Sequence, residues 1–244
     1  MCPMRRLPIL LIAIGFPAGG LYAMTLPKGV GAADWLSIQK EYQRQRHGAF
    51  PIAGGGYRAR GWEQQWLTIF DGRGFDIVPD GGGWRWGLQL QSYGFAGAER
   101  QVTAMRARVG SDVERVSYRW ADGLEEWFVN RADGLEHGYT LAHRPGIAGA
   151  GPLLLHLAVR GGLHASASGG GIRFSNASGA AVLNYAGLRV TDAWGRELTA
   201  RMAVEAAGLR LEIDEGARPH RALRADVRQV EAGPGVVRLE VDAT

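Results

Sequence analysis

Cysteine is nearly absent: Cys2 is the only one in 244 residues. It lies in an N-terminal segment that we expect to be removed, so the mature chain would have no thiol, no disulfide and no cysteine-ligated metal. A chain of this length can fold on its apolar core alone. Apolar residues make up 46% of the sequence, so a sizeable core is expected.

Lysine is also scarce, because Lys28 and Lys40 are the only two and all other basic residues are arginines. The arginines alternate with acidic residues, whereas nucleic-acid-binding proteins gather basic residues on one face. The formal charge of +4 includes Arg5 and Arg6, and without them it is +2. We therefore exclude nucleic acid as a partner.

The sequence has no apolar run long enough for a membrane-spanning helix, which needs about 20 residues. The run at residues 7–16 follows Arg5 and Arg6 and precedes small residues, a pattern typical of a secretory signal. We expect cleavage after Ala23, with a site near Ala32 or an uncleaved anchor as alternatives. The mature chain, residues 24–244, would then be secreted to the periplasm, cell surface or exterior, with no integral membrane segment.

Motifs for catalysis and for metal or cofactor binding are missing. The sequence has no HExxH, GxSxG, Walker or EF-hand pattern. His137 and His143 flank one predicted strand, but we interpret them as polar strand positions. Glu125 and Glu126 are adjacent, so a strand directs them to opposite faces and they cannot flank one glycosidic bond. We expect no catalytic residue, no metal and no cofactor.

Helical periodicity occurs once, at residues 34–47, where Asp34 can cap the helix and Trp35, Ile38 and Tyr42 recur at helical spacing. The Gly-rich residues 50–61 lack periodicity and are predicted to form a loop. Strand patterns fill the rest of the chain. They cover residues 64–70, 75–79, 84–95, 102–109, 113–120, 124–131, 135–142, 153–159, 171–175, 181–185, 188–191, 197–204, 208–214 and 235–242.

A duplicated Ala-Asp-Gly-Leu-Glu block, at residues 121–125 and 132–136, predicts two hairpin turns. A two-residue loop at Asp122-Gly123 would place Tyr118 opposite Trp127. The second turn has two alternatives. A three-residue loop ending at Gly134 brings Tyr139 beside Trp127, whereas a two-residue loop requires a middle strand buried on both faces. We favour the three-residue loop because it keeps one face apolar.

Closely spaced strands with one helix predict an all-β fold, an antiparallel β-sandwich preceded by a short N-terminal helix. We expect a signal peptide at residues 1–23. A linker, the helix and the Gly-rich loop would follow at residues 24–61, and the sandwich would span residues 62–244. The Gly/Ala/Pro-rich residues 145–152 are the best candidate for a division into two packed halves.

The order of motifs also carries a family resemblance over residues 33–217. Its main pieces read ADWLSIQKEYQRQ, WRWGLQLQSYG, VSYRWADGLEEWFVNRADGLEHGYTL, AVLNYAGLRVTDAWGREL and LRLEIDEGA. This order resembles the N-terminal β-rich domain that precedes FG-GAP-type β-propeller repeats in large secreted bacterial proteins. No such repeats follow in the given sequence, which leaves a free-standing relative or a truncated leader domain as the alternatives. The resemblance implies fold and location, and it implies no active site.

The sequence thus predicts a secreted or cell-surface structural or interaction module without enzymatic activity. The alternative is a carbohydrate-binding β-sandwich, with or without glycoside hydrolase activity. The chain has eight tryptophans, and aromatic rings on a sheet can stack on sugars, although they more often form core. Trp84 and Trp86 are the candidate ligand-binding residues if such a face exists. The partner, a protein or a glycan, is not specified by the sequence.

Overall fold

The computed structural model describes residues 28–102, 108–111, 115–145, 151–214 and 223–228. The chain divides into two units, residues 1–39 and 40–244, and all described strands belong to the second. The expected signal segment and the expected strand at residues 235–242 lie outside the described residues, as does most of the expected strand at 102–109.

The helix predicted near the N-terminus is confirmed as α1 (Ala32–His47). It begins two residues earlier than expected, so Asp34 lies in its first turn, where a carboxylate stabilises the positive end of the helix.

The strands pair antiparallel throughout the described chain. They are β1 (Ala49–Pro51), β2 (Tyr57–Gly61), β3 (Trp66–Phe70), β4 (Gly74–Pro79), β5 (Trp86–Phe95), β6 (Arg100–Gln101), β7 (Arg108–Ser111), β8 (Arg115–Arg119), β9 (Leu124–Arg131), β10 (Gly134–Leu141), β11 (Leu153–Gly161), β12 (His164–Ser168), β13 (Gly171–Ser175), β14 (Ala181–Tyr185), β15 (Arg189–Asp192), β16 (Glu197–Glu205), β17 (Gly208–Asp214) and β18 (Leu223–Arg228).

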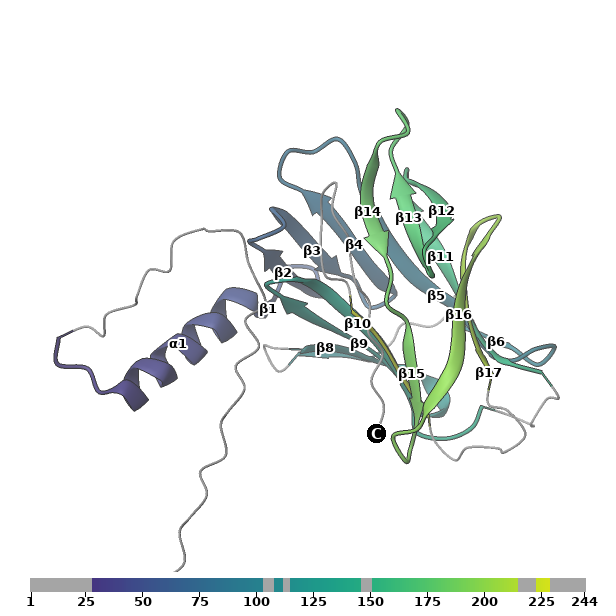
Figure 1. Cartoon of the computed structure of the whole chain (residues 1–244), viewed down its shortest axis with the longest axis horizontal. Coiled ribbons are helices and arrows are strands. Elements are labelled where there is room, and N and C mark those ends of the chain that lie inside the picture. Colours follow the sequence, from purple (N-terminus) through teal and green to yellow (C-terminus); the bar gives the residue numbers. More distant parts are fainter. Residues whose placement is uncertain (1–27, 103–107, 112–114, 146–150, 215–222, 229–244) are drawn as a thin grey trace, which may run out of the picture. The chain divides into compact units, whose positions relative to one another are not determined.

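Two layers form the sandwich that the sequence predicts (Figure 1). Sheet A has the order β1-β2-β3-β4-β5-β11-β17-β16, with β6 beside β5, and sheet B has the order β15-β18-β10-β9-β8-β7. Strand β16 joins them, because it pairs with β17 along most of its length and with β15 at its start. A third sheet, sheet C, has the order β12-β13-β14.

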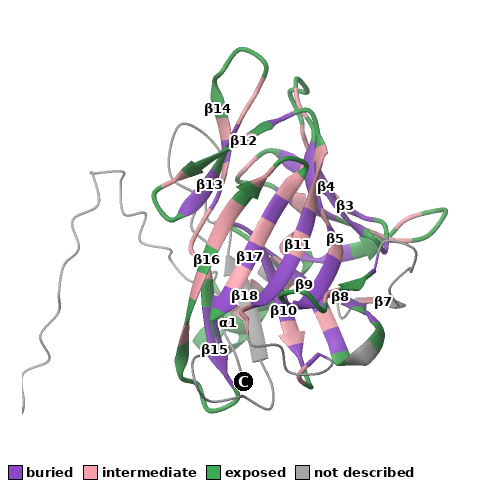
Figure 2. Cartoon of the chain, turned by 90° about the vertical axis from the view of Figure 1, so that its right-hand side faces the viewer, coloured by how far each residue is buried: buried purple, intermediate pink, exposed green. Residues whose placement is uncertain are grey.

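The core lies between the sheets, where aromatic rings from all three meet. Phe75 of sheet A contacts Phe128 of sheet B with ring centroids 5.2 Å apart, and Trp86 of sheet A contacts Phe174 of sheet C at 4.9 Å. Buried residues run along β5, β11 and β17 in Figure 2. Strand β5, which precedes residues 145–152, pairs with β11, which follows them, so sheet A contains strands from both sides of that segment.

The Gly-rich residues 50–61 do not form the predicted loop. Strands β1 and β2 pair there, with Phe50 opposite Arg58, and Gly54, Gly55 and Gly56 make the turn with φ of 89°, 95° and 92°. These backbone angles favour glycine because it lacks a Cβ. The three-residue β1 is too short to show a period of two. Strands β12 and β18 also lie in stretches for which no strand was predicted.

The predicted register of the duplicated turns is wrong at both. The first turn is a three-residue 3₁₀ helix (Ala121–Gly123), which places Tyr118 opposite Glu126. At the second turn Gly134 itself pairs with Arg131, so Tyr139 also lies opposite Glu126. A shift of one residue exchanges the two faces of a strand. Glu126 therefore faces the core, and Trp127 is buried on the other face of the sheet.

Candidate functional site

The two tryptophans predicted to bind a ligand are not an exposed pair. Trp86 has 0% of its surface exposed, and its ring contacts Phe75 and Phe174, so it belongs to the core, which is the more usual place for aromatic residues on a strand. Trp84 is half-buried and packs against the core. The strand predicted at residues 84–95 is confirmed as β5, and its face with Trp86, Leu88 and Leu90 is turned to the core.

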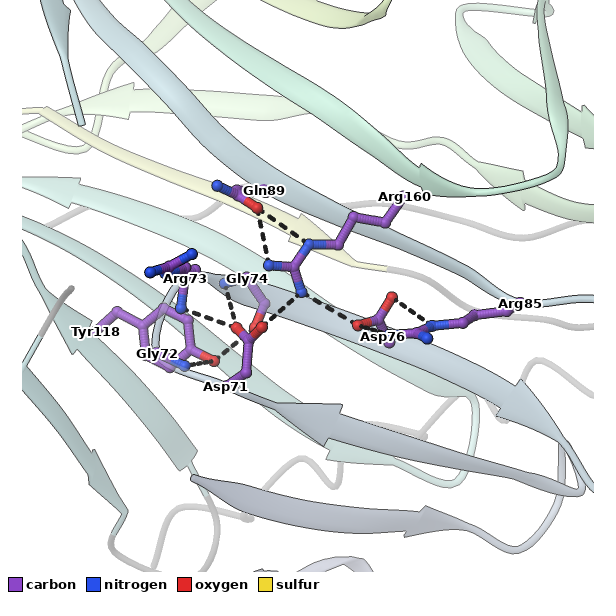
Figure 3. Close-up of polar contacts among 9 residues, drawn as sticks. All are labelled: Asp71, Gly72, Arg73, Gly74, Asp76, Arg85, Gln89, Tyr118 and Arg160. Carbon is purple, nitrogen blue, oxygen red and sulfur yellow. Dashed lines mark hydrogen bonds and ion pairs between the residues drawn. The ribbon is translucent and has the colours of Figure 1, made fainter. Parts of the chain in front are cut away.

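A cluster of charged residues lies on the face of sheet A that is turned away from the core. Asp76 alternates along β4 with Phe75 and Ile77, which face the core. Gly87 of β5 pairs with Asp76 on one side and with Arg160 of β11 on the other, so Asp76 and Arg160 lie level with each other two strands apart. Arg160 Nη1 donates to Asp71 Oδ2 at 2.9 Å and to Asp76 Oδ2 at 3.1 Å (Figure 3).

The remaining contacts of this cluster give Arg160 and both aspartates further hydrogen-bond partners. Arg160 also donates through Nε and Nη2 to Gln89 Oε1, at 3.2 and 2.8 Å. Arg85 donates to both carboxylate oxygens of the buried Asp76, at 3.0 and 2.7 Å. Asp71 Oδ1 accepts from the backbone amides of Arg73 and Gly74. The cluster thereby links the β3–β4 turn to β4, β5 and β11.

The same contacts argue against Asp71 as the catalytic acid of a carboxylate pair. Both aspartates lie on one nitrogen, so their contacting oxygens are within about 6 Å of each other, a spacing found in glycoside hydrolases. Such an enzyme needs one carboxyl whose pKa is raised. Burial tends to raise the pKa of Asp71, but hydrogen bonds from Arg73 and Arg160 outweigh it and hold the pKa below its usual value.

Arg160→Ala tests whether the ion pairs of Arg160 with Asp71 and Asp76 stabilise the fold. We expect the variant to lose about 1–3 kcal/mol of unfolding free energy at pH 7, because several hydrogen bonds to charged groups disappear. The depressed pKa of Asp71 contributes stability above the unfolded-state pKa, about 3.9, and this contribution is lost as pH falls through the folded-state pKa. The difference between wild type and variant should therefore shrink between pH 7 and pH 3.

Urea denaturation at both pH values measures this difference. Arg201→Ala is the control, because Arg201 is exposed and forms a single surface ion pair with Glu212, worth about 1 kcal/mol or less. If Arg160→Ala lost the same unfolding free energy at pH 7 and at pH 3, the proposed stabilising ion pairs would be contradicted.

A second polar cluster is buried between the sheets, around Glu126. Its Oε1 accepts from Tyr139 Oη at 2.8 Å and from His137 Nε2 at 2.9 Å, and its Oε2 accepts from Trp120 Nε1 at 3.1 Å. The other ring nitrogen of His137, Nδ1, lies 3.2 Å from Tyr185 Oη, so both nitrogens of the ring have a hydrogen-bond partner. Burial, together with the charge of Glu126, raises the pKa of Tyr139 well above its usual value.

This buried cluster is structural. Glu126 and Tyr139 have no exposed surface and His137 has 1%, so substrate cannot reach them. His137 does not pair with His143 as a metal ligand, because both its ring nitrogens are engaged and His143 is exposed. No group of three or more metal-ligating side chains occurs within the described part of the chain.

An open pocket lies beside the C-terminal end of α1. It has a volume of about 350 Å³ and is lined by Tyr42, Gln45, Arg46 and Trp62. Tyr42 is 58% exposed and Trp62 is 52% exposed, although most tryptophans of this unit are buried. The guanidinium carbons of Arg46 and Arg60 lie 5.9 and 5.2 Å from the centroid of the Trp62 ring.

Hydrogen bonds to the end of the helix hold this pocket in place. Trp62 Nε1 donates to the carbonyl of Arg46 at 3.1 Å, and Asn130 Nδ2 donates to the carbonyl of His47 at 3.2 Å. These carbonyls have no partner within the helix, so side chains from the sheets satisfy them. Arg46 also forms an ion pair with Glu63 at 3.0 Å. The helix side of the pocket is thus fixed to the sandwich side.

Sequence reasoning did not find this pocket. Trp62 follows the Gly-rich segment and lies outside the alternating strand patterns, so nothing linked it to the helix. The available signal was the spacing of Tyr42, Gln45 and Arg46, which share one face of α1. This spacing predicts that the three residues share a face of the helix, but only the tertiary structure shows that Trp62 lies beside that face.

Comparisons with protein-family models, with curated proteins and with solved structures gave no match to this chain. Across the ranges that the structure covers, no helix is long and apolar enough to cross a membrane. The case for function therefore rests on the sequence and on the site geometry above.

Proposed function

We propose that the chain is a secreted, non-enzymatic interaction module that contacts its partner at the pocket lined by Tyr42, Gln45, Arg46 and Trp62. The N-terminal signal pattern supports secretion. The motif order supports a relation to the domains that precede FG-GAP-type propellers. Both remain predictions from the sequence.

The observation that carries the proposal is the exposure of Tyr42 and Trp62 at one open pocket. Exposed aromatic side chains that flank a concavity are typical of binding sites, whereas isolated exposed apolar residues are ordinary. The acidic groups at Arg160, by contrast, are held by arginines and by backbone amides. This contrast favours binding over catalysis.

Site-specific photocrosslinking in the producing cell tests the proposal. A photoreactive amino acid at Gln45 should give a discrete adduct, which Trp62→Ala in the same chain should remove. The control places the photoreactive amino acid at Trp194, an exposed position in the β15–β16 turn. Equal adducts from positions 45 and 194, or none from position 45, would reject the pocket as the contact surface.

A further inference from the structure

We infer that this pocket takes an uncharged sugar ring. The inference rests on the proposed function and names the ligand class for the same site. It places sugar recognition at Tyr42 and Trp62, which are exposed, and not at the buried Trp86.

The size and lining of the pocket favour a small ring over a protein segment. Its volume of about 350 Å³ is at the lower end of the range of roughly 300–1,000 Å³ for small-molecule sites. The pocket surface is mainly apolar, because Tyr42 and Trp62 contribute their rings. A sugar has one face of C–H groups that can lie on an aromatic ring and a rim of hydroxyls that needs polar partners.

Polar groups for that rim are present at the edge of the pocket. Gln45 Nε2 donates to Glu41 Oε1 at 2.8 Å, which orients the side-chain amide. Its carbonyl oxygen can accept from a hydroxyl, and the Arg46 guanidinium can donate to one. A few placed polar groups beside apolar rings are the usual composition of a specific small-molecule site.

The charges around the pocket favour a neutral ligand. Arg46 is paired with Glu63, and Arg60, which lies over Trp62, is paired with Asp80. Each guanidinium therefore has its own carboxylate, so the pocket offers no unbalanced positive charge to a sulfated or carboxylated glycan. An acidic glycan would have to displace these carboxylates.

The test is a glycan array containing neutral and acidic oligosaccharides, followed by titration of each hit with tryptophan fluorescence. Mature wild-type protein should bind neutral glycans saturably. Trp62→Ala should weaken binding about tenfold or more, which corresponds to about 1.4 kcal/mol. Tyr42→Ala should weaken binding as well. Trp194→Ala is the matched control, since it removes another exposed indole and should leave affinity unchanged.

Trp62→Phe distinguishes stacking of the sugar on the aromatic ring from the hydrogen bond that joins Trp62 to the end of α1. It keeps an aromatic ring but loses the Nε1 donor to the Arg46 carbonyl, so it should retain most of the affinity if stacking dominates. Circular dichroism of each variant verifies the fold. A preference for acidic glycans, equal losses in Trp62→Ala and Trp194→Ala, or no binding at millimolar glycan would overturn the inference. A protein adduct from position 45 without glycan binding would leave the proposed function standing.

Discussion

Glu126→Ala should lower the free energy of unfolding by about 3–5 kcal/mol, the usual effect of removing one partner from a buried charged cluster. Tyr139, His137 and Trp120 each donate to the Glu126 carboxylate from buried positions. Without the carboxylate these buried donors lose their acceptor, and each buried donor without an acceptor lowers the free energy of unfolding. Chemical denaturation at pH 7 measures the loss.

The neighbouring residue supplies the control for this experiment. Glu125 lies on the opposite face of β9 and forms a partly exposed ion pair with Arg115 at 3.1 Å. Glu125→Ala should therefore change stability by about 1 kcal/mol or less. Glu126→Ala and Glu125→Ala losses that were similarly small would contradict the buried position of Glu126.

Trp86→Ala should also destabilise the fold by about 3–5 kcal/mol, as is typical for deletion of a large core aromatic residue. The Trp86 ring lies against Phe75 of the same sheet and against Phe174 and Tyr185 of sheet C. Its removal would leave a cavity where sheet C meets the core. Thermal and urea unfolding measure the loss, and near-ultraviolet circular dichroism reports on the packing.

Trp194→Ala is again the control, because Trp194 is 63% exposed and the substitution should change stability by about 0.5 kcal/mol or less. A stable Trp86→Ala variant that instead lost ligand binding would restore the role predicted from the sequence. We expect the reverse: loss of stability at Trp86 and loss of binding, without large loss of stability, at Trp62.

Local patterns in the sequence determined most of the secondary structure. The alternation of Leu88 and Leu90 with Gln89 predicted β5, and the spacing of Trp35, Ile38 and Tyr42 predicted α1, because both depend on residues close in the chain. The adjacent Glu125 and Glu126 point to opposite faces, as predicted, since side chains alternate along any strand.

Tertiary structure decided the rest, because the remaining questions concern partners distant in sequence. The register of β9 and β10 depends on whether Gly134 belongs to the turn or to the strand. A change of one residue in the length of the turn exchanges the faces, and so decides whether Glu126 or Trp127 faces the core. The exposure of Trp86 depends on sheet C, which is built from residues about 80 to 100 positions further on.

The pocket illustrates the same division. The sequence determined that Tyr42, Gln45 and Arg46 share a helix face, and that Trp62 stands outside a regular strand pattern. Only the folded chain brings them together, because Trp62 donates to the last turn of α1 and Asn130, a residue of β9, fixes the end of that turn. Binding sites that combine distant segments have no local signature, since their geometry comes from packing and not from spacing along the chain.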